Sequence, residues 1–253
     1  MYAPERQRAI LDRARVDGRV DVTELAEELG VTPETIRRDL TLLERHGHLR
    51  RVHGGAIPVE RLGFEPAVAA REGVLVAEKE RIAKRALEEL PAEGAVILDA
   101  GTTTARLAEA LPLDRELTVV TTGLQVATVL AGRPHVTLHV IGGLIRGRTL
   151  AAVGDWTEAA LREVYADVVF LGTNGISIRR GLTTADRAEA AAKRAMINAA
   201  RRRVVLADHT KVGSDHFATF GQLEDVDVVI TDTGLDEESA AELEAAGPKV
   251  VRA

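Results

Sequence analysis

The chain has 253 residues, of which 45% are hydrophobic and 28% are charged, and its formal net charge is −6. This is the composition of an ordinary globular protein, and it excludes collagen-like, mucin-like and wholly disordered chains. The chain contains no cysteine and only 3% aromatic residues, which excludes disulfide bonds and thiolate metal sites and disfavours a surface that stacks single-stranded bases.

The first residues and the hydrophobicity of the chain indicate neither export nor a membrane location. The opening MYAPERQRAI is charged from Glu5 onward and lacks an apolar core, so we expect no signal peptide. No stretch approaches the roughly 20 apolar residues of a membrane span. Together with the lack of cysteine, these features predict a cytoplasmic protein without a membrane partner.

Charge is distributed unevenly along the chain. Residues 1–61 contain 11 basic and 11 acidic side chains, so the net charge of −6 comes from the remainder. Within Thr32–His53, five arginines stand against three acids. The acidic remainder does not abolish this local basic cluster, because screening at 0.1 M salt cuts interactions beyond about 10 Å.

The first part of the chain predicts three short helices followed by a strand and a glycine turn. The first helix is expected over Arg6–Arg15, and the second after Asp21, which precedes a glutamate at capping-box spacing. Thr32 and Pro33 begin the third helix, because a hydroxyl N-cap followed by proline favours the first helical turn. The segment Leu49–Gly55 predicts a strand that runs into the turn.

A linker separates this part from the rest of the chain. Residues 58–76 contain prolines and glycines without a clean hydrophobic period. The sequence therefore predicts a first domain over residues 1–57, a linker over 58–76 and a second domain over 77–253.

The second domain alternates apolar strands with helices. Strands with the loops that end them are expected at 97–104, 119–123, 139–143, 168–175, 204–210 and 228–234. Helices are expected around 105–111, 124–131, 156–163, 188–199 and 236–245. Continuous Val/Ile/Leu runs indicate a parallel sheet buried on both faces, and such sheets bind ligands at the carboxyl ends of their strands.

The second and third helices have the spacing of a helix-turn-helix motif. Hydroxyls and arginines at the start of a helix can meet phosphates and base edges in the major groove of double-stranded DNA. The candidate contacts on this helix are Thr32, Glu34, Thr35, Arg37 and Arg38. A basic wing after it would add Arg50, Arg51 and His53. From the pattern alone, a small helical domain with a solvated charged face remains the alternative.

One strand end of the second domain suits a phosphorylated ligand in particular. In Asp99–Thr104, Gly101 lets the backbone approach, while the hydroxyls of Thr102 and Thr103 and the free N–H groups of a helix start suit a phosphate. Asp99 can accept hydrogen bonds from sugar hydroxyls. The alternative is a helix cap after a buried strand. The loop is neither a Walker loop nor a dinucleotide fingerprint.

Four further segments could complete the same pocket. Lys211, in the loop that follows strand 204–207, can act as a point-charge partner of a phosphate, or it is simply a surface residue. The other candidate ligand contacts are Thr122, Gly142, Gly143, Arg146 and Asn174. Structural turns explain the threonine and glycine loops equally well.

The sequence resembles the DeoR family of bacterial transcriptional regulators. The motifs that carry the resemblance are Arg6-x3-Ile10, Thr35-Ile36-Arg37-Arg38-Asp39-Leu40, His53-Gly54-Gly55-Ala56, Asp99-Ala100-Gly101-Thr102-Thr103, Gly142-Gly143, Gly172-Thr173-Asn174-Gly175, Lys193-Arg194-Ala195-Met196 and Leu206-Ala207-Asp208-His209-Thr210-Lys211. They cover essentially the whole chain. The resemblance implies a winged helix-turn-helix joined to a sugar-phosphate-sensing α/β domain whose fold is related to ribose-5-phosphate isomerase.

The resemblance also implies a function. The expected protein is a repressor of a sugar-metabolism operon that a phosphorylated sugar releases from operator DNA. Phosphorylated fructose, galactitol, glycerol and deoxyribose all match what the family implies for the effector. A helix-turn-helix covers few base pairs, so we expect a homo-oligomer, either a dimer or a tetramer.

The alternative function is a sugar-phosphate isomerase with a DNA-binding appendage. Isomerisation needs an acid and a base at the sugar carbons. The isomerases carry an acidic pair after the fourth strand, where this chain has Phe170–Gly175 without a carboxylate. The remaining candidate acids are Asp99, Asp186, Glu189 and Asp208. This departure favours binding without turnover, and we expect no catalytic residues.

Metal and nucleophile chemistry find little support in the sequence. His46 and His48 lack a third ligand at metal-binding spacing, so we expect no metal site and no cofactor. The serines Ser177, Ser214 and Ser239 lie in no nucleophile elbow, which disfavours a catalytic triad.

Overall fold

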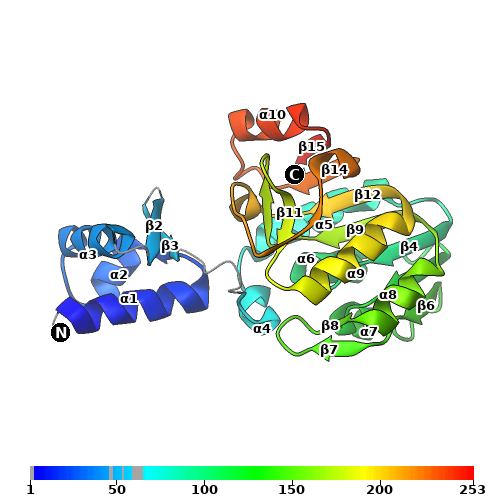
Figure 1. Cartoon of the computed structure of the whole chain (residues 1–253), viewed down its shortest axis with the longest axis horizontal. Helices are drawn as coiled ribbons and strands as arrows, with labels where there is room; N and C mark the ends of the chain where they lie inside the picture. The colour runs from blue at the N-terminus through cyan, green and yellow to red at the C-terminus, as the bar shows by residue number, and fades with distance from the viewer. Residues whose placement is uncertain (1–2, 46–47, 53, 59–64) are drawn as a thin grey trace. The chain divides into compact units, whose positions relative to one another are not determined.

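The computed structural model describes residues 3–45, 48–52, 54–58 and 65–253. Contacts divide the chain into two compact units, Met1–Pro66 and Ala67–Ala253. The first is mainly helical, and the second is built on a large sheet (Figure 1). Within the described ranges, no helix combines the length and the apolar character that a bilayer-spanning segment needs.

The N-terminal unit is a winged helix-turn-helix, as the sequence predicts. Its elements are α1 (Ala3–Asp17), β1 (Val20–Asp21), α2 (Val22–Glu28), α3 (Pro33–Arg45), β2 (Leu49–Val52) and β3 (Gly55–Pro58). The strands form an antiparallel sheet in the order β1-β3-β2. Helix α2 begins at Val22, directly after Asp21, where the sequence predicts it. The cause is Asp21, which caps this helix by accepting hydrogen bonds from Thr23 N at 2.7 Å and Glu24 N at 3.4 Å.

A small apolar core holds the N-terminal unit together. Ile10 of α1 and Ile36 and Leu40 of α3 are fully buried, and burial of each such side chain contributes about 1.5–3 kcal/mol. Gly55 is required where β3 meets β1, because a Cβ there would lie 1.9 Å from the carbonyl oxygen of Val20.

The C-terminal unit contains one large parallel sheet. Its helices are α4 (Val68–Glu72), α5 (Val76–Ala86), α6 (Thr102–Ala110), α7 (Leu124–Leu130), α8 (Asp155–Arg162), α9 (Arg187–Asn198) and α10 (Glu237–Ala245). The strands of the large sheet are β4 (Gly94–Leu98), β5 (Leu117–Thr121), β6 (Val136–Val140), β9 (Ala166–Gly172), β12 (Ala200–Leu206), β14 (Val228–Thr231) and β15 (Lys249–Arg252). They are parallel, in the order β15-β14-β12-β9-β4-β5-β6.

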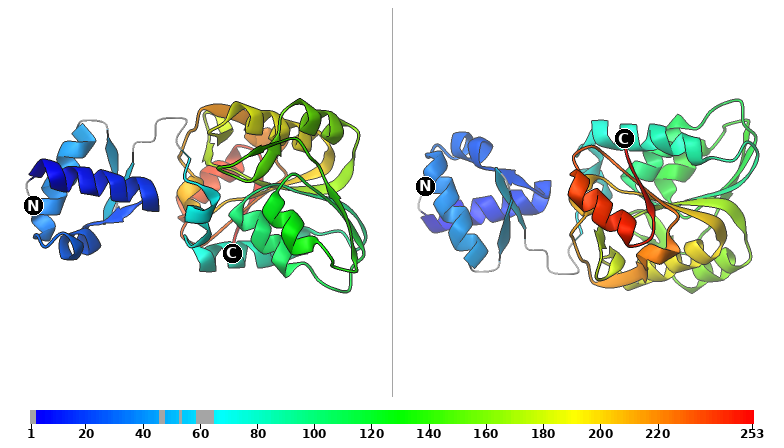
Figure 2. Two further views of the ribbon diagram at one scale, coloured as in Figure 1. Left: turned by 90° about the horizontal axis from the view of Figure 1, so that it is seen from below. Right: turned by 90° about the horizontal axis from the view of Figure 1, so that it is seen from above.

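Helices cover both faces of this sheet, as Figure 2 shows. On one face, Leu98 packs in a cluster with side chains of α5, α6 and α7. On the other face, Ile97 belongs to a cluster that includes side chains of α8, α9 and α10. Neighbouring residues of one strand are thus both buried, which is the burial that continuous apolar strand runs predict.

Several short elements lie outside the predicted pattern. Strands β10 (Gly175–Ser177), β11 (Gly181–Thr184) and β13 (Ala218–Gly221) form a small antiparallel sheet, and β7 (Leu144–Arg146) pairs with β8 (Ala151–Val153). Each of these strands has only three or four residues. So short a segment shows no recognisable period, which is why the sequence did not predict it.

The start of the C-terminal unit also differs from the prediction. The sequence assigns residues 58–76 to a linker, whereas contacts place the division after Pro66. Helix α4 lies in the stretch expected to be linker, and its Val68 is 4% exposed. The backbone N–H of Val68 donates to the carbonyl of Arg148 at 2.8 Å. Packing therefore makes α4 part of the second unit.

Candidate functional site

The polar face of α3 is the exposed face of the helix-turn-helix. Its apolar residues Ile36, Leu40 and Leu43 are turned into the core of the N-terminal unit. Of the predicted DNA contacts on this helix, Thr35 is half-buried and the others are exposed, namely Thr32, Glu34, Arg37 and Arg38. The amphipathic pattern thus leaves arginines and hydroxyls available on one surface.

Local hydrogen bonds arrange these polar side chains. Thr32 Oγ1 lies 2.9 Å from Thr35 Oγ1 and accepts from Thr35 N at 3.3 Å, so it caps the start of α3. A guanidinium nitrogen of Arg37 lies 3.3 Å from Glu34 Oε2. An exposed ion pair of this kind is worth about 0–1 kcal/mol. Breaking this ion pair so that Arg37 can contact DNA would therefore cost little free energy.

The wing is tied to α3 by Arg51. Its backbone N–H donates to Glu44 Oε1 at 2.8 Å, and its guanidinium donates to Thr41 Oγ1 at 3.0 Å. The sequence did not predict a role for Thr41 and Glu44, because their partner Arg51 lies on β2, which follows the end of α3 in the chain. Arg50 is exposed on the same strand. His53 lies outside the described residues.

Two residues of the N-terminal motifs have a structural role. Asp39 of α3 is 5% exposed, and it accepts from Arg6 Nε at 2.6 Å and from Gln7 Nε2 at 2.9 Å. This buried charge-assisted bond joins α1 to α3. It sets the direction of α3 without taking a side chain from the exposed face.

In the C-terminal unit, Asp99 directly follows β4 at the carboxyl edge of the sheet. One of its oxygens accepts from Ala100 N at 2.8 Å, and the other accepts from Gly172 N at 2.9 Å. Lys193 of α9 also donates to the second oxygen and to the carbonyl of Gly172 at 2.9 Å. Asp99 is thus a buried acceptor inside the unit, and its contact with sugar hydroxyls stays a prediction.

The loop after Asp99 keeps the features expected of an anion site. Gly101 is the N-cap of α6 and supplies no side-chain bond to the helix start. Thr102 is half-buried, while Thr103 and Thr104 are buried, and Thr104 Oγ1 donates to the carbonyl of Gly101 at 3.0 Å. Thr122, predicted to join this pocket, is 1% exposed. A ligand contact of Thr122 stays a prediction.

The Gly142–Gly143 turn is structural in this fold. Thr157 Oγ1 donates to the carbonyl of Gly142 at 2.9 Å. At Gly143 the backbone φ is +153°, and a Cβ would lie 2.1 Å from Thr157 Oγ1. Close packing on α8 thus explains the glycine at position 143, whereas a Cβ at Gly142 would meet nothing within 4 Å.

Arg146 and Asn174 belong to a polar network around the start of α9. Arg146 lies 3.0 Å from Glu189 Oε1 and 3.3 Å from Asp186 Oδ2. The hydroxyl of Thr184 donates to the amide oxygen of Asn174 at 2.8 Å and lies 3.3 Å from Glu189 Oε2. Arg146 therefore neutralises a buried carboxylate, and its contact with a ligand anion stays a prediction.

The buried charged residues of α9 have a structural role that the sequence did not predict. Glu189 and Lys193 are four residues apart on one face of this helix, and both are buried, at 5% and 6% exposure. Charged residues at helical spacing among the small residues Ala190 and Ala192 were the available signal. Charged side chains are rarely fully buried without partners, so this signal indicates a polar centre in the fold.

The loop after β12 holds the predicted phosphate lysine. Asp208 caps the 3₁₀ turn η2 (His209–Lys211) by accepting from Thr210 N at 3.1 Å, and Lys211 is half-buried. The ring of His209 lies 2.8 Å from Asp232. Burial raises the pKa of Asp232, but hydrogen bonds from the backbone of His209 and Gly234 and from the His209 ring outweigh it and hold the pKa below its usual value.

A second lysine lies near this loop. Lys79 of α5 is 4% exposed, and burial lowers its pKa to about 8. The nearby carboxylate of Asp208 acts in the opposite direction, while the cations Lys211, Arg71 and Arg106 lower the pKa further. The charged groups that act on Lys79 are thus three cations and one carboxylate, and this local excess of positive charge suits an anionic ligand.

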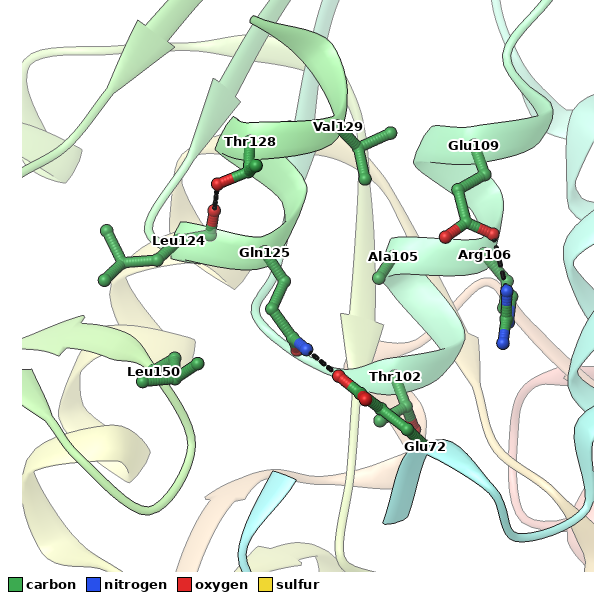
Figure 3. Close-up of a pocket in the computed structure, with 10 residues that line it drawn as sticks. All are labelled: Glu72, Thr102, Ala105, Arg106, Glu109, Leu124, Gln125, Thr128, Val129 and Leu150. Atoms are coloured by element: carbon green, nitrogen blue, oxygen red, sulfur yellow. Dashed lines mark hydrogen bonds and ion pairs between the residues drawn. The ribbon is translucent and has the colours of Figure 1, made fainter. Parts of the chain in front are cut away.

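A hollow of about 410 Å³ opens beside these loops, between α4, α6 and α7 (Figure 3). It is lined by Glu72, Thr102, Ala105, Arg106, Glu109, Leu124, Gln125, Thr128, Val129 and Leu150. Figure 3 shows Gln125 and Glu72 joined by a hydrogen bond across one side of it. Of the predicted effector residues, Thr102 alone is among its lining residues.

Comparison with known proteins identifies both units. A model described as the DeoR-like helix-turn-helix domain matches residues 6–61, and one described as the DeoR C terminal sensor domain matches residues 75–233. The HTH-type transcriptional regulator GlpR of Haloferax volcanii is 39% identical over 99% of this chain and 98% of its own length. A putative aga operon transcriptional repressor of Escherichia coli O157:H7 is 32% identical over 98% and 93%. The glycerol-3-phosphate regulon repressor of Escherichia coli K12 is 32% identical over 92% of each chain.

Solved structures match only part of the chain. Ribose 5 phosphate isomerase A from Neisseria gonorrhoeae has 20% identity and a TM-score of 0.38 over 54% of this chain and 53% of its own. The eIF2B beta protein of Chaetomium thermophilum has 15% identity and a TM-score of 0.42 over 64% and 52%.

A helix-turn-helix and a sensor domain in one chain define a class of protein, the ligand-responsive transcriptional regulators. The chain belongs to the DeoR family of these regulators. It is a DNA-binding regulator and not an enzyme, so the main interpretation of the sequence is confirmed over the isomerase alternative.

Proposed function

We propose that this regulator represses a sugar-metabolism operon in the cytoplasm and leaves its operator when a phosphorylated sugar binds the C-terminal unit. The observation that carries the proposal is the group of cations around Lys79 at the carboxyl edge of the sheet, with Thr102 on one loop and Lys211 on another. The names of two relatives, a glycerol-3-phosphate regulon repressor and an aga operon repressor, support the same direction.

In this proposal the ligand spans neighbouring loops of the sheet. Strand β9 lies between β4 and β12, so the loops after all three open at one edge. Thr102, Thr103 and the start of α6 bind the phosphate together with Lys211, and Asn174 on the middle loop contacts sugar hydroxyls. Asp99 positions these loops from within.

Release from DNA requires that the effector prefer one of two states. A ligand that binds both states equally shifts nothing, so the sugar phosphate must bind more tightly to the state that holds DNA poorly. By reciprocity, operator DNA must weaken effector binding by the same factor. Two recognition helices per operator require a dimer or a tetramer.

A paired experiment tests the function. Purified protein is mixed with a fragment of its own promoter in a gel shift, with and without glycerol 3-phosphate, fructose 1-phosphate, fructose 6-phosphate, galactitol 1-phosphate and deoxyribose 5-phosphate. We expect a specific shift that one of these compounds reverses. Failure to shift that promoter, or a shift that none of these compounds alters, would contradict the proposal.

The recognition helix is tested by Arg37→Ala and Arg38→Ala. Each variant is expected to lose about 1–3 kcal/mol of operator affinity, because a base contact is removed, or to weaken all DNA sequences alike if the contact is to phosphate. Gel shifts on cognate and scrambled DNA distinguish the two results.

The matched control for these variants is Arg13→Ala, which removes an exposed arginine from α1. This variant should bind the operator as the wild type does. Circular dichroism verifies the fold of all three. Wild-type affinity in both α3 variants would show that this face of α3 does not read DNA.

The effector site is tested by Lys211→Ala. Removal of a charge-assisted contact worth about 1.5–3 kcal/mol should weaken effector binding roughly 10–100-fold. Operator binding should persist, because it depends on the N-terminal unit. Calorimetry with the sugar phosphate that reverses the gel shift measures the first quantity, and a gel shift measures the second.

Lys84→Ala serves as the control, since Lys84 is exposed on α5 and takes no part in the proposed site. It should leave effector affinity unchanged. If Lys211→Ala also binds the effector like the wild type, the phosphate site lies elsewhere.

A further inference from the structure

Helix α4 is the first helix of the C-terminal unit, so the covalent connection to the DNA-binding unit enters there. The backbone N–H of Val68 donates to the carbonyl of Arg148 at 2.8 Å. Glu72 accepts a hydrogen bond from Gln125. Arg148 lies between β7 and β8, and Gln125 lies in the first turn of α7, so these contacts attach α4 to the C-terminal unit at two places.

Lys79 supplies the strongest of these attachments. Its ammonium donates to the carbonyl of Arg71, in the last turn of α4, and to that of Val74, two residues beyond the helix, each at 2.6 Å. A buried ammonium has three donors and needs partners for them. Lys79 therefore holds the end of α4 by two charge-assisted bonds, which are about twice as strong as neutral ones.

The surroundings of Lys79 connect it with the effector loops. The charged groups near it are Asp208 and Lys211 from the loop after β12, Arg71 from α4, and Arg106 from α6. One carboxylate thus faces several cations. An anion beside Lys211 and Thr102 would interact favourably with Lys79 as well, in competition with the carbonyls of Arg71 and Val74.

The chain between α4 and α5 is strained. Leu75, which precedes α5, has a φ of +52° in the left-handed region. A leucine adopts this conformation only when its surroundings enforce it. The bond from Lys79 to the neighbouring Val74 is one such constraint, so its loss would allow this turn to relax.

We propose that Lys79 is the residue that couples the effector site to the DNA-binding unit, by holding α4 in the DNA-competent state and releasing it when an anion occupies the site. The inference rests on the proposed function. Lys79 acts here as a positioning residue, because it affects DNA through α4 and not by contact. The device is two-state, as a coupling mechanism requires.

Hydrogen exchange followed by mass spectrometry tests the coupling in the full-length protein. In the wild type, inorganic phosphate should speed exchange in residues 68–75 roughly tenfold, against a sodium chloride control of equal ionic strength. In Lys79→Met, these residues should already exchange at the faster rate, and phosphate should add nothing. Lys84→Met, on the exposed face of α5, should behave like the wild type.

Operator binding gives the second measurement. Without effector, Lys79→Met should bind the operator as weakly as the wild type does with the sugar phosphate that reverses its gel shift. The effector should then change operator affinity of the variant by less than about twofold, where allosteric coupling is typically 5–150-fold.

The outcomes separate this proposal from the proposed function. If the wild type is released by a sugar phosphate and Lys79→Met is released equally, coupling through Lys79 is wrong while the function stands. If phosphate leaves exchange of residues 68–75 unchanged in the wild type, the proposal is also wrong, and this result does not depend on any variant that fails to fold.

Discussion

Operator affinity is expected to fall about 10³–10⁵-fold when salt rises from 50 to 200 mM, if an oligomer contacts 6–10 phosphates. Each copy offers the exposed side chains of Arg37, Arg38, Arg50 and Arg51. The N-terminal 61 residues are neutral overall, and the chain carries a net charge of −6. Binding therefore depends on this small cluster, so two copies are needed to reach that number of contacts.

The measurement is an anisotropy titration of a labelled operator fragment at several potassium chloride concentrations. Sedimentation at the same protein concentration gives the oligomeric state. Arg51→Ala should lower the salt slope by about 1 per copy if the wing contacts a phosphate. Arg13→Ala should leave the slope unchanged. A monomer that binds tightly at high salt would overturn the expectation.

The second large effect concerns stability. Lys193→Met should destabilise the C-terminal unit by about 3–5 kcal/mol, because it leaves the buried carboxylate of Asp99 without its cation. The two side chains are only 8% and 4% exposed. Lys193 also lies 5.4 Å from the centre of the Phe220 ring, a cation–π contact that the variant loses.

Urea unfolding followed by circular dichroism measures this effect. Arg106→Met is the matched control, since Arg106 and Glu109 form an ion pair at 2.8 Å that is much more exposed. Such a pair contributes about 0–1 kcal/mol. If the free energy of unfolding of Lys193→Met lies within about 1 kcal/mol of the wild-type value, the ion pair does not stabilise Asp99 in the way the geometry indicates.

The same internal pairing is consistent with a protein that binds without turnover. Of the acids considered for an isomerase, Asp99 is bound by Lys193, and Glu189 by Arg146. Asp186 caps α9, and Asp208 caps η2. A general base must reach a substrate proton, and each of these carboxylates is already engaged in holding the fold together.

The helices and strands that depend on neighbouring residues could be predicted from the amino-acid sequence. Thr32 and Pro33 begin α3 because capping and proline preference act within one helical turn. The Val/Ile/Leu runs predicted six of the seven parallel strands, with the loops after β4 and β12 at one edge. Strand β15 follows α10 as a short segment near the C-terminus, and its pairing with β14 has no local signal.

The partners of the buried charged residues, in contrast, could be known only from the tertiary structure. Lys193 meets Asp99 across 94 residues of sequence, and Lys79 finds its partners in a segment expected to be linker. The physical reason is that burying a charge is unfavourable unless a partner is buried with it. That partner is supplied by whichever strand, helix or loop the fold places nearby, so its identity depends on long-range packing and not on sequence spacing.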